Sequence, residues 1–130
     1  MDIYIRPYEE GDFSKINALS QAESWTNLVE KQQDAKQAWA NSTVAFVAEV
    51  NGEFVGCIRG LTDGFISLYI CELIVDQHCR GQGVGKKLLN YVHELFPKAR
   101  MELLASQTSK TFYESNSFRP FYGFRKIIEE

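Results

Sequence analysis

The sequence has few cysteines and histidines, no excess of positive charge and no long apolar run. No window comes near the roughly 18 consecutive apolar residues of a membrane-spanning helix, so we predict no membrane partner. The three cysteines form no Cys-x-x-Cys pair, and His78 and His93 lie too far apart for a short metal motif. A formal net charge of -3 and a pI near 5.4 lack the basic surface that holds nucleic acid. We therefore predict no metal and no nucleic-acid partner.

What the chain does contain is a large apolar fraction. Hydrophobic residues make up 45% of the 130 residues and aromatic residues 13%, which is enough for one packed core. No internal repeat, low-complexity stretch or linker divides the chain, so residues 1–130 are predicted to form a single domain. The first residues lack the apolar stretch of a secretory signal, and together with the unpaired cysteines this favours a cytoplasmic protein.

The N-terminal part of the chain is predicted to form one strand followed by two helices. Residues 3–5 alternate as a short strand that stops at Pro7. Apolar residues then recur at helical spacing over residues 13–19 and again over residues 28–39, with a break at residues 24–27.

The middle of the chain carries the strongest hairpin signal. Residues 43–50 and 54–61 are rich in strand-forming residues and flank Asn51-Gly52, a dipeptide that accepts positive φ at the tip of a tight turn. A second turn at Asp63-Gly64 leads into residues 65–75, which are apolar almost throughout. Such a run predicts a central strand that is buried on both faces.

The C-terminal half is predicted to continue as helix, strand, helix and strand. Residues 83–96 repeat apolar side chains at three- and four-residue steps and end before a proline. Residues 101–105 predict a brief strand, residues 108–114 a short helix, and residues 118–128 an aromatic-rich terminal strand or pair of strands. The alternation of strands and helices is that of an α/β chain.

The most informative motif stands between the central strand and the long helix, where the sequence reads Cys79-Arg80-Gly81-Gln82-Gly83-Val84-Gly85-Lys86-Lys87. Glycine lets the backbone adopt unusual dihedral angles, and the first amides of the following helix have no intrahelical acceptors. These amides and the helix dipole make a cradle for a phosphate group. The alternative is an ordinary tight turn from strand to helix.

Two other phosphate-binding motifs fit this run less well. A P-loop requires Ser or Thr after Gly-Lys, and here Lys87 follows Lys86. The dinucleotide fingerprint requires a third spaced glycine, and Leu88 stands near that place.

With these residues in view, the sequence resembles the GNAT family of N-acetyltransferases. The family motif is Arg or Gln, two residues, Gly, one residue, then Gly or Ala, and it is present as Arg80, Gly83 and Gly85. The resemblance extends along nearly the whole chain, at Ile5-Arg6-Pro7, Asn51-Gly52, Val55-Gly56, Val75-Asp76 and Phe112-Tyr113-Glu114.

The resemblance implies a fold and a reaction. The fold is α/β of the α+β kind, with a central, mixed and mostly antiparallel sheet that is splayed between its fourth and fifth strands, and about four helices. The implied co-substrate is acetyl-coenzyme A, wedged in the gap of the sheet. The implied reaction is acyl transfer to an amine, without a metal.

Two stretches of backbone are expected to hold coenzyme A. A strand edge left open by the splay would offer its amides and carbonyls to the pantetheine arm at Leu73, Ile74 and Val75. The diphosphate would lie over the amides of Arg80, Gly81, Gln82, Gly83, Val84, Gly85 and Lys86.

Glu72 is the candidate general base, because it is a carboxylate in an otherwise apolar strand. An alkylammonium has a pKa of about 10.4, so a base is needed to free the attacking amine at neutral pH. Strict alternation places Glu72 on one face with Ile70 and Ile74. The alternative is a solvated or ion-paired glutamate, and Asp76 is expected to shape the turn instead.

Tyr113 is the candidate general acid, since it matches a tyrosine that many family members carry on the helix after the fifth strand. Its phenol could donate a proton to the departing thiolate, and the alternative is an aromatic core residue. The chain departs from the family pattern at Ser117, where a glycine is usual, and at Ala105-Ser106, where an asparagine is frequent. A shifted alignment would match Tyr122 instead of Tyr113.

The acceptor is predicted to be the primary amine of a small molecule, for example one like an aminoglycoside or a polyamine. Its pocket could be lined by aromatic residues that are otherwise core residues, namely Trp25, Trp39, Phe65 and Tyr69. A protein or peptide amine is the alternative acceptor, and a coenzyme-A-binding module without catalysis is the alternative function. The open edges of the terminal strands are compatible with a homodimer.

Overall fold

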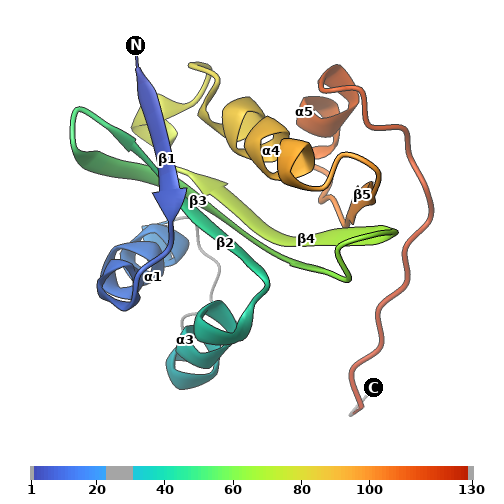
Figure 1. Ribbon diagram of the computed structural model, residues 1–130, viewed down its shortest axis with the longest axis horizontal. Coiled ribbons are helices and arrows are strands. Elements are labelled where there is room, and N and C mark those ends of the chain that lie inside the picture. The colour runs from blue at the N-terminus through green and yellow to red at the C-terminus, as the bar shows by residue number, and fades with distance from the viewer. Residues whose placement is uncertain (1, 23–30, 129–130) are drawn as a thin grey trace.

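A computed structural model describes residues 2–22 and 31–128 of the chain. Its elements are β1 (Ile3–Pro7), η1 (Glu10–Asp12), α1 (Phe13–Ala22), α3 (Gln32–Asn41), β2 (Val44–Val50), β3 (Glu53–Thr62), β4 (Ser67–Val75), η2 (Gln77–Cys79), α4 (Val84–Leu95), β5 (Arg100–Leu103) and α5 (Lys110–Ser115). Figure 1 shows one twisted sheet, with α1 and α3 on one face and α4 and α5 on the other. No helix in this part of the chain is long and apolar enough to cross a bilayer.

The sheet has the strand order β1-β2-β3-β4-β5. Neighbouring strands are antiparallel from β1 to β4, whereas β5 runs parallel to β4. The predicted hairpin is confirmed, because Asn51 and Gly52 join β2 to β3 with φ values of 54° and 80°. The sheet is therefore mixed and mostly antiparallel, as predicted.

The splay between the fourth and fifth strands is also confirmed. β5 pairs only with the start of β4, from Ser67 opposite Arg100 to Ile70 opposite Leu103. Residues 71–75 of β4 continue beyond this pairing and have no strand partner on the β5 side. The backbone groups on that edge are left available to another hydrogen-bonding partner.

Each face of the sheet has its own hydrophobic core. On one face α4 buries Val84, Leu88 and Val92 against the strands, which confirms the predicted helical stripe. On the other face Phe13, Ile16 and Trp39 of α1 and α3 pack on Val47 of β2 and Ile74 of β4. Burying one such side chain contributes about 1.5–3 kcal/mol, so the two cores hold the helices on the sheet.

The half-buried Arg6 ties β1 and β2 to the turn before α1. The Arg6 guanidinium donates two hydrogen bonds to Asp12, at 2.9 and 2.8 Å, and also pairs with Glu49. This bidentate pair is the main reason that the pKa of Asp12 is lowered. It gives Arg6 of the Ile5-Arg6-Pro7 motif a structural role.

A β-bulge in β4 interrupts the side-chain alternation that the sequence predicts. Arg59 pairs with Glu72 and the next residue of β3 pairs with Ile70, so Cys71 is an extra residue on β4. Ile70 packs in the core beneath α4, whereas Ile74 packs in the core beneath α1 and α3. The placement of Ile70 on the face of Glu72 was wrong, because alternation holds only where no bulge interrupts the strand.

The predicted C-terminal strand is also wrong. Phe118 packs on Tyr113, but residues 119–128 form neither strand nor helix and are exposed (Figure 1). The aromatic pattern favours a strand, yet a strand forms only where its backbone finds a partner, and Pro120 offers no amide hydrogen. The described chain therefore has five strands rather than six or seven.

The central strand begins later than predicted, at Ser67. Phe65 and Ile66 lie in an exposed turn, where the Asp63 carboxylate accepts hydrogen bonds from their amides at 2.8 Å. Tyr69 is 38% exposed, so the first part of β4 is buried on only one face. The predicted helix break at residues 24–27, together with the start of the second helix at residue 28, lies outside the described residues.

Gly60, beside the bulge, gives a test of how closely β3 and β4 pack. A Cβ atom there would lie 2.7 Å from the backbone oxygen of Tyr69. We expect Gly60→Ala to lower the free energy of unfolding by about 1–3 kcal/mol in urea denaturation, because the strands must move apart. Gly11→Ala is the control, since a Cβ at Gly11 meets nothing within 4 Å. An equal loss in both variants would contradict the close approach.

Candidate active site

The turn that leaves β4 is held by the residue that follows the strand. The amide of Asp76 donates to the carbonyl of Val55 at 2.8 Å, and its carboxylate accepts a hydrogen bond from the amide of His78 at 2.9 Å. Asp76 therefore caps η2 and fixes the direction of the chain toward the glycines, which confirms its predicted turn role.

Two of the three glycines adopt the left-handed conformation. Gly81 has a φ of 79° and Gly83 a φ of 87°, and Gly83 is the N-cap of α4. A Cβ atom at either position would meet nothing within 4 Å, so the backbone conformation and not the space requires glycine. Gly85 differs, because its Cβ atom would lie 3.0 Å from the ring of Phe112 and 3.7 Å from Val75.

The first turn of α4 leaves a row of backbone donors without acceptors. The first helical bond is made by Lys87, whose amide donates to the carbonyl of Gly83 at 3.0 Å. In the described structure, no residue accepts a hydrogen bond from the amides of Val84, Gly85 or Lys86. Together with the helix dipole, these amides make the site attractive to an anion.

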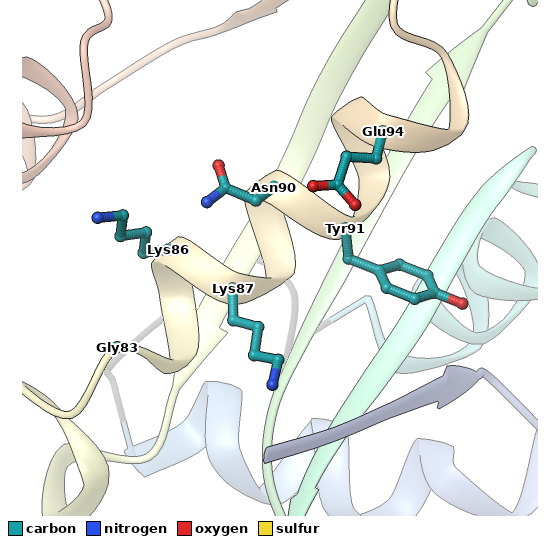
Figure 2. A pocket seen from close by; sticks show the side chains of 6 residues that line it. All are labelled: Gly83, Lys86, Lys87, Asn90, Tyr91 and Glu94. Atoms are coloured by element: carbon teal, nitrogen blue, oxygen red, sulfur yellow. The ribbon is translucent and has the colours of Figure 1, made fainter. Parts of the chain in front are cut away.

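A surface hollow of about 320 Å³ continues from the glycine turn along α4. Gly83, Lys86, Lys87, Asn90, Tyr91 and Glu94 line it. Figure 2 shows the side chains of Lys86 and Lys87 leaving the start of α4 in different directions, so the two lysines spread positive charge around the N-terminus of the helix. This charge adds to that of the helix dipole.

Glu72 is ion-paired, as its alternative interpretation allowed. Its Oε2 atom lies 2.5 Å from Nε of Arg59 on β3, and the two side chains are 6% and 15% exposed. Arg59 also donates to the hydroxyl of Ser42 at the end of α3, at 3.3 Å. Oε1 of Glu72 has no hydrogen-bond partner among the described residues.

Sequence reasoning missed Arg59. The available signal was that Arg59 is the single charged residue of the predicted strand at residues 54–61. Cys57 is fully buried near Glu72. Burial and the charge of Glu72 both raise the pKa of its thiol. Burial also raises the pKa of Cys71, so neither thiol is an activated nucleophile.

Tyr113 lies on the other face of the sheet, on α5. Its ring packs between Phe112 and Phe118, with centroids 5.0 and 5.4 Å away, and burial raises its pKa. Because Phe112 touches Gly85, α5 is held next to the glycine turn and the end of β4. Tyr122 is 97% exposed and lies outside this packing.

The described aromatic residues that could have lined an acceptor pocket lie apart, and Trp39 is a core residue, which was the alternative. Trp39 is 2% exposed and packs on Tyr8 in the core, Phe65 is at the β3–β4 turn, and Trp25 lies outside the described residues. Histidine and acidic residues are equally scattered, and the described part of the chain contains no group of three or more metal-binding side chains.

A sheet that opens beside its central strand and passes through a glycine turn into a helix is the framework of a coenzyme-A-dependent acyltransferase. The family profile described as acetyltransferase (GNAT) domain matches residues 41–120. The chain belongs to this family and is a GNAT-type N-acetyltransferase. No curated protein sequence matches it.

Solved structures agree with this assignment. A GNAT-family acetyltransferase from Streptococcus pneumoniae is 28% identical, with a TM-score of 0.80 over 99% of this chain and 98% of that one. An aminoglycoside acetyltransferase from an uncultured soil metagenomic sample, in complex with sisomicin, is 18% identical with a TM-score of 0.69 over 97% and 96%. The PaiA N-acetyltransferase of Thermoplasma acidophilum, in complex with coenzyme A, is 16% identical with a TM-score of 0.67 over 89% of each chain.

Substitutions in the buried pair of Arg59 and Glu72 should have non-additive effects on the free energy of unfolding. We expect Arg59→Met and Glu72→Met to cost about 3–5 kcal/mol each, because each leaves an uncompensated buried charge, and the double variant to cost less than their sum. Urea denaturation measures all three. The control is Lys36→Met, which removes the exposed pair with Glu10 and should cost less than about 1 kcal/mol. Additive losses would contradict the coupling of Arg59 and Glu72.

Proposed function

We propose that the protein transfers the acetyl group of acetyl-coenzyme A to the primary amine of a small molecule, with both substrates bound at once. The observation that carries this proposal is the junction of an unpaired strand edge with the free amides of α4. The likeness of fold to an aminoglycoside acetyltransferase supports a small-molecule acceptor. We also propose that residues 1–130 act as one domain, in the cytoplasm.

The residues at the glycine turn fit coenzyme A. Diphosphate needs donors that approach closely, and the left-handed Gly81 and Gly83 place no side chain beside the free amides of Val84, Gly85 and Lys86. We assign the diphosphate to Arg80, Gly81, Gln82, Gly83, Val84, Gly85 and Lys86. The pantetheine arm is assigned to the open edge at Leu73, Ile74 and Val75, whose backbone supplies both donors and acceptors. When bound, the co-substrate supplies the acetyl group as a thioester.

Glu72 is proposed to take the proton of the attacking amine through a water molecule. Its Oε2 atom is held by Arg59, which fixes the carboxylate, while Oε1 has no hydrogen-bond partner among the described residues and is assigned the proton. The neutral amine then attacks the carbonyl carbon, and a backbone amide near Ile74 polarises that carbonyl.

Tyr113 is proposed to protonate the departing thiolate. A thiol has a pKa of about 8.5 and tyrosine one of about 10. Burial raises the pKa of Tyr113 further, so its phenol keeps its proton at neutral pH and can donate it. The exposed Tyr122 lacks such a setting.

Gly83→Ala should weaken the binding of coenzyme A. The left-handed conformation costs a residue with a Cβ about 1–2 kcal/mol, and relief of this strain would turn the amides away from the diphosphate. We expect isothermal titration calorimetry to show a Kd about tenfold or more higher. Gly52→Ala is the matched control, since Gly52 has a φ of 80° and equal space but lies in the β2–β3 turn. Equal affinity in the two variants would refute the cradle.

Tyr113→Phe should lower kcat for acetyl transfer by about 100-fold, the lower range of general acid catalysis. Thioester cleavage with a panel of small amines measures it, and mass spectrometry identifies the acetylated amine. Because the acid works only when protonated, the wild-type rate should fall as the pH rises through the raised pKa of Tyr113, above about 10. This fall should be absent in Tyr113→Phe.

Two other Tyr→Phe substitutions test whether the loss of activity is specific to Tyr113. Tyr4→Phe removes the hydroxyl of a 63% exposed residue on β1 and should leave the rate unchanged. If Tyr122→Phe rather than Tyr113→Phe lost activity, the acid would be Tyr122. Binding of coenzyme A without acetylation of any amine would favour the non-catalytic module, and acetylation of proteins alone would favour the alternative acceptor.

A further inference from the structure

The buried ion pair of Arg59 and Glu72 is joined to the end of α3 by a hydroxyl group. Ser42 is the C-cap of α3, and its Oγ donates a hydrogen bond to the carbonyl of Ala38 in the last turn of the helix, at 2.6 Å. Nη1 of Arg59 donates to the same Oγ atom at 3.3 Å, and Nε donates to Oε2 of Glu72 at 2.5 Å. A continuous chain of hydrogen bonds therefore runs from α3 through β3 to the carboxylate on β4.

The chemistry of these groups fixes the direction of the chain of hydrogen bonds. A serine hydroxyl has one proton to donate, and the bond to Ala38 uses it, so Oγ faces Arg59 as an acceptor. A guanidinium group only donates, and its atoms lie in one plane. Because Ser42 and Glu72 accept from two different nitrogens, they together fix the orientation of the Arg59 plane. The orientation of that plane in turn fixes the carboxylate of Glu72.

The carboxylate of Asp12, which also pairs with an arginine, is bound in a different way. Its Oδ1 atom accepts from Arg6, and its Oδ2 atom accepts from Arg6 and from the amide of Glu9. Both oxygens are thus used to hold the fold together. Glu72 accepts from Arg59 at Oε2 alone, and among the described residues its Oε1 atom has no hydrogen-bond partner. The pair on β3 and β4 therefore leaves one carboxylate oxygen that the fold does not use.

Stability is a weak explanation for a charged pair at this position. The side chains of Arg59 and Glu72 are 15% and 6% exposed, so both charges have lost most of their water. Well-packed apolar residues in place of a buried ion pair often leave a protein equally stable or more stable. Glu72 also lies within residues 71–75 of β4, which have no strand partner on the β5 side. An oriented carboxylate on this strand is what the proposed proton transfer from an amine requires.

We infer that Ser42 and Arg59 are positioning residues for the general base, with Ser42 orienting Arg59 and Arg59 orienting Glu72. The inference rests on the function proposed above, in which Glu72 takes the proton of the acceptor amine through a water molecule. In this role neither positioning residue exchanges a proton. The amine loses its proton to Glu72, Arg59 keeps its charge, and the hydroxyl of Ser42 keeps its bond to α3. The rate of acetyl transfer therefore depends on how the end of α3 is placed against β3.

Steady-state kinetics of Arg59→Lys tests the contact between Arg59 and the base. Lysine keeps the positive charge but lacks the planar fork, so it no longer holds the carboxylate in one orientation. We expect kcat to fall about tenfold or more, with KM for the amine and Kd for coenzyme A within about twofold of the wild type, because misplacement acts on the chemical step. The control is Arg6→Lys, which makes the same change in the pair with Asp12 and should leave kcat unchanged.

Ser42→Ala tests the contact between α3 and Arg59 in a variant that keeps both charges of the buried pair. Without the hydroxyl, Nη1 of Arg59 is no longer held, and we expect kcat to fall about threefold to tenfold. Ser42→Thr keeps a hydroxyl and should restore the rate. Asn41→Ala is the matched control, because Asn41 donates to the carbonyl of Gln37 at 2.8 Å in the same part of α3 but has no hydrogen bond to Arg59 in the described structure. Equal losses in Ser42→Ala and Asn41→Ala would overturn the role of the hydroxyl.

A double-mutant cycle on kcat separates positioning of the base from support of the fold. If both residues act through Glu72, adding Arg59→Lys or Ser42→Ala to Glu72→Gln lowers kcat no further, although each lowers it in the wild type. A further loss in the Glu72→Gln background would overturn the inference.

The same kinetics distinguish failure of this inference from failure of the proposed function. Full kcat in Arg59→Lys and Ser42→Ala, with a slow Glu72→Gln, overturns the positioning roles and leaves Glu72 as the base. Full kcat in Glu72→Gln overturns the base, and the inference with it. When no amine in the panel reacts, hydrolysis of acetyl-coenzyme A by water supplies the rate. A wild type without either activity overturns both the proposed function and the inference.

Discussion

The parting of β5 from β4 after Ile70 is the constraint on which the candidate site depends. Because β5 pairs with β4 only over its own length, residues 71–75 of β4 keep an unpaired edge. The chain then turns at Asp76 and starts α4 at Gly83, so a row of free amides follows directly on that edge. Backbone groups therefore form a continuous polar surface at the site proposed for coenzyme A.

The bulge at Cys71 decides which side chains reach this region from each face of the sheet. It places Glu72 with Arg59 beneath α1 and α3, while Tyr113 stays with α4 and α5 on the opposite face. A carboxylate and a phenol in such different settings can play different proton-transfer roles. Beyond Ile70, β5 no longer pairs with β4, so the sheet is open between these two groups of residues.

Predictions from local sequence patterns were correct where backbone sterics or a short periodic repeat decide the structure. The Asn51-Gly52 hairpin, the amphipathic stripe of α4 and the left-handed glycines all follow from backbone sterics and short-range periodicity. The position of Ile70 and the partner of Glu72 did not, because each depends on a neighbour far away in sequence. The terminal segment reads as a strand but has no strand beside it within its own chain.

The amino-acid sequence by itself determined the hairpin and the glycine turn before α4, since these depend on residues within a few positions of one another, and it determined the family from short motifs along the chain. It also named Glu72 and Tyr113 as the groups that could move protons. Only the tertiary structure decided that Arg59 holds Glu72, that Phe112 holds α5 against Gly85, and that the segment after Phe118 stays unpaired. These outcomes depend on bulges and strand pairing, which join distant residues and leave no local signature.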